Sequence, residues 1–212
     1  MVLHINVISD VICPWCYIGK RRLEKAIAAL DRHYDVHVRW LPFQLNPQMP
    51  KEGISRREYR IRKFGSWERS QELDAQVAAA GKAEGIHFAF DRMERTPNTL
   101  DAHRLIWLAD KQDIQDAVVE AMFRAYFTDG RDISNRQTLI DEVSEAGLER
   151  DQTEAVLDSN DGMEAIREAG EQARRFRVNG VPFFILNDKI TLGGAQPPEA
   201  FLEAFRQATA SA

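Results

Sequence analysis

A cysteine pair at the junction between an apolar strand and an amphipathic helix constrains the fold of this chain most. The only two cysteines among 212 residues are Cys13 and Cys16, with Pro14 and Trp15 between them. Residues 2–8 alternate apolar and polar side chains, which is typical of a strand. This spacing on the first turn of a helix brings both sulfurs within bonding distance, so the two thiols can form a disulfide.

Patterns along the rest of the chain predict a strand–helix–strand unit, a helical block, and a C-terminal hairpin followed by a helix. Apolar residues recur at helical spacing from the cysteine pair to Leu30, and residues 35–41 alternate as a second strand. From about residue 50 to 176 the spacing is helical. The β pattern returns at 182–192, and the prolines at 197–198 open a final helix, because proline is favoured in a first turn.

Start signals divide the helical block into separate helices. Ser55 and Glu58 are placed as a capping box, Asn98 as an N-cap, and Ser134 with Gln137 as a second box. The chain has no internal repeat, low-complexity segment or Gly/Ser linker. A second domain is therefore expected to be inserted into the first.

Composition and charge narrow the class of partners. With 44% hydrophobic residues, the chain can bury a substantial core. A formal net charge of -5, with Lys and Arg interspersed among acidic residues, gives no basic surface for a phosphate backbone, so nucleic acid is not an expected partner.

The N-terminal sequence has no signal-peptide pattern, and no apolar run approaches the roughly 20 residues that cross a bilayer. We expect no membrane contact and a cytoplasmic location, where a lone cysteine pair is more often catalytic, redox-sensing or metal-binding than structural.

The placement of the two cysteines gives them different expected roles. Unpaired backbone N–H groups and the helix dipole stabilise a thiolate at a helix N-terminus, which is where Cys13 lies. Cys13 would be the exposed nucleophile, and Cys16, one turn deeper, would resolve the mixed disulfide. Pro14 fixes the backbone at the first helical position, and Trp15 offers an apolar face beside the thiol.

The cysteine pair has two further interpretations besides redox chemistry. The two cysteines could be small buried hydrophobes, or two of the four ligands of a zinc ion. The five histidines show none of the paired spacing of zinc ligands, and we assign them no role: they are His4, His33, His37, His87 and His103. We interpret Lys20, Arg21 and Arg22 as a solvated helix surface, because charges on an exposed face are heavily screened.

Pro182 is the second candidate element of the site. It could be an ordinary strand-opening proline. It directly precedes the C-terminal hairpin, however, at a position that should face the N-terminus of the first helix. We therefore predict a cis Val181–Pro182 bond that directs the backbone groups of Val181 toward an incoming chain.

These motifs resemble the cytoplasmic, FrnE-like branch of the DsbA-like thioredoxin-fold proteins. The resemblance covers essentially the whole chain and is carried by four collinear segments, at residues 10–19, 98–105, 180–184 and 193–198. It implies an α/β thioredoxin fold interrupted by a helical insertion, with residues 1–48 and 171–212 forming the discontinuous thioredoxin-like domain and residues 49–170 the insertion.

The resemblance also implies residue roles: Cys13 as nucleophile, Cys16 as resolving thiol and Pro182 as the cis-proline that receives substrate backbone. Some members carry a second C-terminal cysteine pair, which this chain lacks, so a relay between two dithiols is excluded. Glutathione-using relatives, the kappa-class transferases and 2-hydroxychromene-2-carboxylate isomerases, have a serine where this chain has Cys13. Retention of both cysteines favours redox chemistry.

The sequence therefore predicts a thiol-disulfide oxidoreductase, acting as reductase or isomerase on protein or small-molecule disulfides and reset by an external thiol reductant. No metal or bound cofactor is expected, and glutathione is a candidate co-substrate. The alternative is a glutathione-dependent isomerase or transferase for an aromatic or polyketide-like molecule, with an apolar pocket between Trp15, Pro182 and the insertion. A third alternative is a non-catalytic module that binds partners at the cis-proline groove. The sequence allows a homodimer, although apolar helix faces such as that through Met122 are expected to be core.

Overall fold

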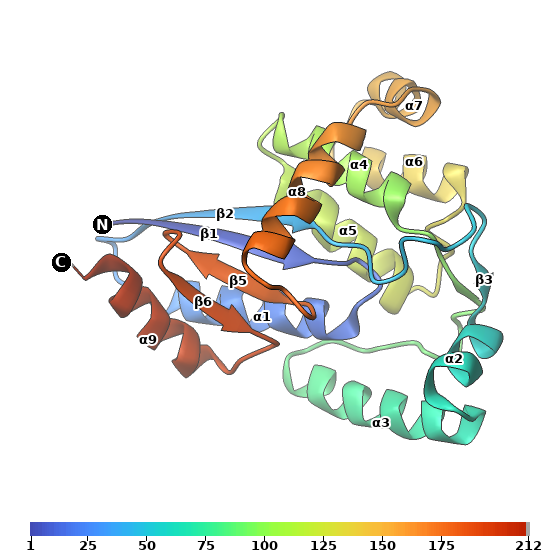
Figure 1. The fold of residues 1–212 in the computed structure, drawn as a ribbon, viewed down its shortest axis with the longest axis horizontal. Coiled ribbons are helices and arrows are strands. Elements are labelled where there is room, and N and C mark those ends of the chain that lie inside the picture. Colours follow the sequence, from blue (N-terminus) through green and yellow to red (C-terminus); the bar gives the residue numbers. More distant parts are fainter. Residues whose placement is uncertain (211–212) are drawn as a thin grey trace.

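A mixed sheet lies in the half of the molecule that holds both chain ends (Figure 1). The computed structural model describes residues 1–210. The order of the four strands is β2-β1-β5-β6, with β2 parallel to β1 and the other neighbours antiparallel. The strand bounds are β1 Val2–Ser9, β2 Asp35–Pro42, β5 Phe183–Leu186 and β6 Ile190–Gly193.

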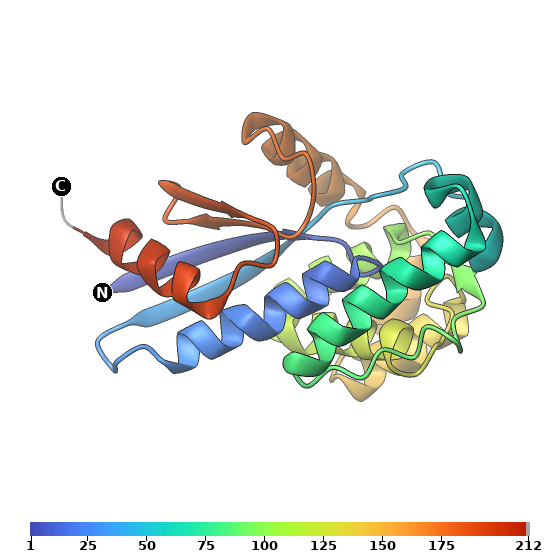
Figure 2. The same ribbon diagram turned by 90° about the horizontal axis from the view of Figure 1, so that it is seen from below.

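Helices cover both faces of this sheet, as the predicted α/β thioredoxin fold requires. Figure 2 shows α1 and α9 on one face and α8 on the other, while the remaining helices form a block at one end. The bounds are α1 Pro14–Ala28, α2 Arg56–Phe64, α3 Trp67–Ala83, α4 Leu100–Asp110, α5 Gln115–Phe127, α6 Arg136–Glu145, α7 Arg150–Asp158, α8 Met163–Arg175 and α9 Pro198–Thr209. Within residues 1–210, none of the helices has the length and apolar character needed to cross a bilayer.

Strand β1 is the centre of the fold because both of its faces are covered. Leu3, Ile5 and Val7 have no exposed surface and join the main core, to which α1 and α9 contribute. Ile8 points the other way and packs with Ala173 of α8. A strand covered on both faces ends in a fixed position, so the turn that follows it holds the cysteine pair in place.

The interior of the helical block is continuous with the main core. Met122 of α5 is fully buried, which confirms that its apolar face belongs to the core. The prediction of purely helical structure between about residues 50 and 176 was wrong locally: β3 (Ile54–Ser55) and β4 (Arg95–Thr96) form a small antiparallel sheet. Each has two residues, which is too few for alternation to be visible in the sequence.

Two predicted helix N-caps are each shifted by one residue. Helix α4 has Thr99 as its N-cap, although Asn98 Oδ1 still accepts a hydrogen bond from Leu100 N at 2.8 Å. Helix α6 is capped by Asn135 instead of Ser134, because the Asn135 side chain accepts from two backbone N–H groups of the first turn. Several polar residues can cap a helix, so the sequence alone places a start only to within about two residues.

The remaining start and turn signals are confirmed. Ser55 Oγ accepts a hydrogen bond from Glu58 N at 3.4 Å at the start of α2. Asn187 and Asp188 have φ angles of 47° and 54°, which suit the tight turn between β5 and β6. The proposed domain boundary at residues 170–171 stays a prediction, and α8 runs across it without a break.

Candidate active site

The cysteine pair lies at the start of α1, as predicted. Cys13 is the N-cap residue and Pro14 the first helical residue. Cys13 N donates a hydrogen bond to Asp10 O at 2.9 Å, and Cys13 O accepts from Cys16 N at 2.9 Å. These bonds fix the turn between β1 and α1, and both cysteines are free thiols.

Cys13 is less exposed than the sequence suggested. Only 6% of its surface is accessible, whereas Trp15 beside it is 41% exposed. The Cys13 thiol donates to Val181 O at 3.4 Å, so the loop before β5 covers one side of the sulfur. The other side faces a cavity, through which a substrate would reach Cys13.

Cys16 lies behind Cys13 and is completely buried. Burial raises the pKa of the Cys16 thiol well above its ordinary value, and the hydrogen bond and charge interaction with Cys13 raise it further. The Ser9 hydroxyl and the Asp10 backbone oppose the shift without overcoming it. Cys16 therefore keeps its proton at neutral pH, and Cys13 is left to attack first.

The loop before β5 lies directly on α1. The Val181–Pro182 bond is cis, as predicted, and Pro182 is buried. A Cβ atom at Gly19 of α1 would lie 2.9 Å from Pro182 Cγ and 3.3 Å from Phe184 Cζ. Gly19 thus allows the proline loop to approach the helix that carries the thiols.

A buried polar pair supports the turn before Cys13. His103 Nε2 lies 3.2 Å from Asp10 Oδ1 and 3.1 Å from Phe43 O. Leu45 N donates to the second oxygen of Asp10 at 2.7 Å. His103 is thus a hydrogen-bonded buried histidine, but its partner is far away in the chain and no local sequence signal identifies it.

The interpretation of Lys20 as a solvated side chain was wrong. Lys20 is 2% exposed, and its Nζ lies 2.9 Å from Asp116 Oδ2 and 3.5 Å from Glu120 Oε2 on α5. Arg22 pairs at 2.6 Å with Glu84, just beyond α3. Acidic residues of the helical block therefore engage these cations, which tie α1 to the block instead of surrounding the thiols with positive charge.

Tyr17 provides a test of this packing by pH. Burial and the charge of Glu120 raise the pKa of Tyr17 from 10.0 to about 12. The folded protein therefore favours the neutral phenol, and this contribution to stability is complete below pH 10 and is lost as the pH rises to about 12. Urea unfolding between pH 8 and about 11 should show a steeper loss for the wild type than for Tyr17→Phe. Equal slopes would contradict the burial of the phenol.

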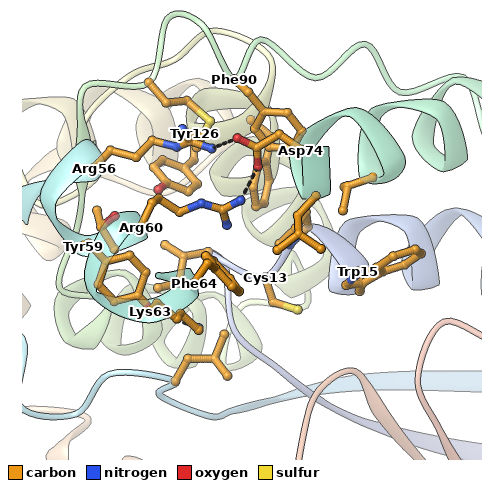
Figure 3. Close-up of a pocket in the computed structure, with 18 of the residues that line it drawn as sticks. Cys13, Trp15, Arg56, Tyr59, Arg60, Lys63, Phe64, Asp74, Phe90 and Tyr126 are labelled. Atoms are coloured by element: carbon orange, nitrogen blue, oxygen red, sulfur yellow. Dashed lines mark hydrogen bonds and ion pairs between the residues drawn. The ribbon is translucent and has the colours of Figure 1, made fainter. Parts of the chain in front are cut away.

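A cavity of about 350 Å³ opens between the start of α1 and helices α2 and α3 (Figure 3). The sequence predicted a pocket between Trp15, Pro182 and the insertion. Trp15 and the insertion line the cavity, but Pro182 does not, because it packs on the side of α1 at Gly19. Cys13 and Pro14 also line it, beside the aromatic residues Tyr59, Phe64, Phe90, Tyr126 and Phe127.

The charged residues of the cavity were not recognised in the sequence. Arg56, Arg60 and Lys63 follow one another at intervals of four and three residues, which places them on one face of α2. Asp74 of α3 lies between the two guanidinium groups, at 2.7 Å from Arg56 and 2.6 Å from Arg60. This spacing of basic residues was the available signal.

Comparisons with known proteins identify a family and a relative that match most of the chain. The family model of the DSBA-like thioredoxin domain matches residues 4–206. An uncharacterised protein of Bacillus subtilis, YwbO, is 26% identical over 200 residues, which cover 92% of each chain.

Solved structures of DsbA-like proteins also match nearly the full length of this chain. The crystal structure of a probable DsbA oxidoreductase from Streptomyces coelicolor is 33% identical, with a TM-score of 0.90 over 97% of this chain and 89% of the other. The cytosolic disulfide reductase DsbM from Pseudomonas aeruginosa, solved with GSH, shares the fold at 21% identity, with a TM-score of 0.67 over 96% and 98% of the two chains. With its thiols, cis-proline loop and helical block arranged in this way, the chain belongs to the DsbA-like thioredoxin family of thiol oxidoreductases.

Proposed function

We propose that this protein is a thiol-disulfide oxidoreductase that reduces or isomerises disulfides with the Cys13–Cys16 dithiol. The proposal rests on the difference in burial and position between the two thiols. Cys13 faces the cavity at the start of α1, whereas Cys16 is fully buried behind it with a raised pKa. An accessible first thiol and a protected second thiol are what stepwise exchange requires.

The proposed reaction has two exchange steps. The Cys13 thiolate attacks one sulfur of the substrate disulfide, the S–S bond breaks, and the first substrate thiolate leaves. Cys16 then attacks the Cys13 sulfur and its proton passes to the departing substrate sulfur, so the second substrate group leaves as a thiol and the Cys13–Cys16 disulfide forms. The two electrons lost by the dithiol reduce the substrate, and an external thiol reductant restores both cysteines.

The proposed partners follow from this chemistry. Pro14, Trp15, Val181 and Pro182 would contact the substrate, because Trp15 is exposed beside the thiol and Val181 O already accepts the Cys13 hydrogen bond. No cofactor other than the redox-active pair is needed. The structure of DsbM with GSH supports glutathione as the reductant or co-substrate, and the cytosolic nature of DsbM supports a cytosolic role here.

Substitution of the resolving cysteine tests the proposal. Cys16→Ser should retain the first exchange and lose the second, so stable mixed disulfides between Cys13 and proteins should accumulate in cells. Mass spectrometry of the purified variant, with and without dithiothreitol, identifies these adducts. The matched control is Cys13→Ser, which keeps Cys16 and should form none because Cys16 is buried.

The same experiment separates the alternative functions. A glutathione adduct alone, together with retained turnover of a small molecule, would favour a glutathione-dependent isomerase or transferase. Partner binding that survives the loss of both thiols would favour a non-catalytic module. Protein mixed disulfides that depend on Cys13 would favour the oxidoreductase over both alternatives.

A further inference from the structure

The cavity beside Cys13 is lined by charged and aromatic side chains that dithiol exchange alone does not require. Its volume of about 350 Å³ falls within the range of small-molecule sites in proteins. Figure 3 shows Cys13 and Trp15 on one side and the side chains of α2 on the other. A ligand in this space would therefore contact the nucleophile and the helical insertion at the same time.

The cavity has an excess of positive charge in a chain that is negative overall. Its charged lining residues are Arg56, Arg60, Lys63 and Asp74, which leaves two positive charges in excess. The whole chain has a formal net charge of -5. The positive charge is thus a local property of this site, which favours an anionic ligand.

The two arginines share a single carboxylate. Arg56 is buried and lies 2.7 Å from one oxygen of Asp74, and Arg60 lies 2.6 Å from the other. Arg60 also donates to Ser70 Oγ at 2.7 Å, which fixes the position of its guanidinium. Burial, together with the charge of Arg56, lowers the pKa of Arg60 although Asp74 opposes the shift. One carboxylate therefore does not fully compensate two guanidinium groups, and a second anion would be stabilised beside Arg60.

Lys63 adds a cation at the exposed edge of the cavity. Its Nζ donates to the Tyr59 hydroxyl at 2.9 Å. No carboxylate of residues 1–210 lies within ion-pair distance of it. Arg60 and Lys63 thus lie on the same face of α2, and each can still bind the carboxylate of a ligand.

Apart from Gln76 and Thr96, the rest of the lining is largely apolar and rich in aromatic rings. Six rings border the cavity: Trp15, Tyr59, Phe64, Phe90, Tyr126 and Phe127. Flat rings pack favourably against an aromatic or similarly apolar ligand, but they leave peptide groups without hydrogen-bond partners. The walls therefore favour a compact apolar body with one acid group.

We propose that this cavity binds small aromatic carboxylates that carry a disulfide, with the carboxylate at Arg60 and Lys63 and the sulfur at Cys13. This inference rests on the proposed function and specifies its substrate class. The exchange is the one described above: Cys13 bonds to the substrate sulfur, Cys16 then displaces it, the dithiol is oxidised by two electrons, and an external thiol restores it.

Binding of a probe without sulfur tests the site separately from the redox chemistry. Naphthoate and the neutral naphthamide have the same aromatic body, and calorimetric titration of each into the reduced wild-type protein isolates the effect of the charge. We expect naphthoate to bind at least about tenfold more tightly, because two cations face its carboxylate. Equal binding of the two probes, or no binding of either, would overturn the proposal.

Substitutions on α2 identify the residues that carry the preference. Arg60→Met should weaken naphthoate binding about tenfold or more, and Lys63→Met, at the exposed edge, about threefold, with little change for naphthamide. The matched control is Arg62→Met on the same helix, since Arg62 is exposed and does not line the cavity. An effect of Arg62→Met equal to that of Lys63→Met would indicate general charge attraction and contradict a specific site.

A single-turnover measurement connects the site to exchange. Reduced protein is mixed with the anionic aromatic disulfide dithiobis(nitrobenzoate) or with neutral dithiodipyridine, without added reductant. Lys63→Met, which removes an exposed cation and its hydrogen bond to Tyr59, should slow the reaction of the anionic disulfide about threefold relative to that of the neutral one. Failure of both disulfides to react would reject the proposed function, whereas equal reaction rates in the variant and wild type would reject only this inference.

Discussion

Replacing Cys13 with serine is expected to lower the rate of insulin reduction by at least about a thousandfold. A serine hydroxyl is a far weaker nucleophile than a thiolate and forms no disulfide, so the first exchange step cannot occur. Cys16 does not replace Cys13, because it is fully buried and its pKa is raised. The reaction is followed by the turbidity of insulin with dithiothreitol as reductant.

The control for this experiment is the stability of the variant. Cys13→Ser changes one atom at a residue whose side chain hydrogen-bonds to Val181 O and to the Cys16 thiol, and because a serine hydroxyl can make similar bonds, its free energy of unfolding should remain within about 1 kcal/mol of the wild type. A correctly folded variant with unchanged insulin reduction would refute the role of Cys13.

Replacing Asp10 with alanine is expected to lower the free energy of unfolding by about 3 kcal/mol. Asp10 has no exposed surface, and its carboxylate is hydrogen-bonded to Leu45 N and to His103 Nε2. The substitution leaves both groups buried, removes the acceptor of Leu45 N, and opens a small space beside the turn that holds Cys13. Urea unfolding monitored by tryptophan fluorescence measures the loss.

Asp10→Asn distinguishes the loss of the acceptor from the loss of charge. Its amide oxygen can still accept from Leu45 N, so we expect a smaller destabilisation, near 1–2 kcal/mol, than for alanine. Asp91 is exposed, and Asp91→Ala serves as the control for a surface aspartate, with an expected change within about 0.5 kcal/mol. Equal effects at positions 10 and 91 would contradict a structural role for the buried pair.

Local patterns were sufficient for the parts of the site that depend on neighbouring residues. The spacing of Cys13 and Cys16 after an apolar strand predicted both their place at a helix start and the order of their depth. The sequence around Pro182 predicted its cis bond, and alternation in residues 2–8 and 35–41 predicted the first two strands. For the strands and the cysteine pair, adjacent residues determine the conformation, whereas the prediction at Pro182 also used its expected position opposite the first helix.

The features that the sequence did not predict depend on contacts between distant segments. The burial of Lys20 depends on acidic residues of α5, and the pairing of Asp10 with His103 joins residues 93 positions apart. The position of the cavity depends on how α2 and α3 pack against α1, which periodicity does not specify. The residues next to Arg60 in the sequence therefore do not show that its side chain lines a cavity.

The charged part of the cavity wall and the thiols come from separate stretches of the chain. The turn between β1 and α1 and the loop before β5 hold the sulfur chemistry, whereas α2 and α3 supply the charges that face it. Reactivity and selectivity can therefore change independently: substitutions along one face of α2 would redirect the choice of substrate while the thiol environment stays intact.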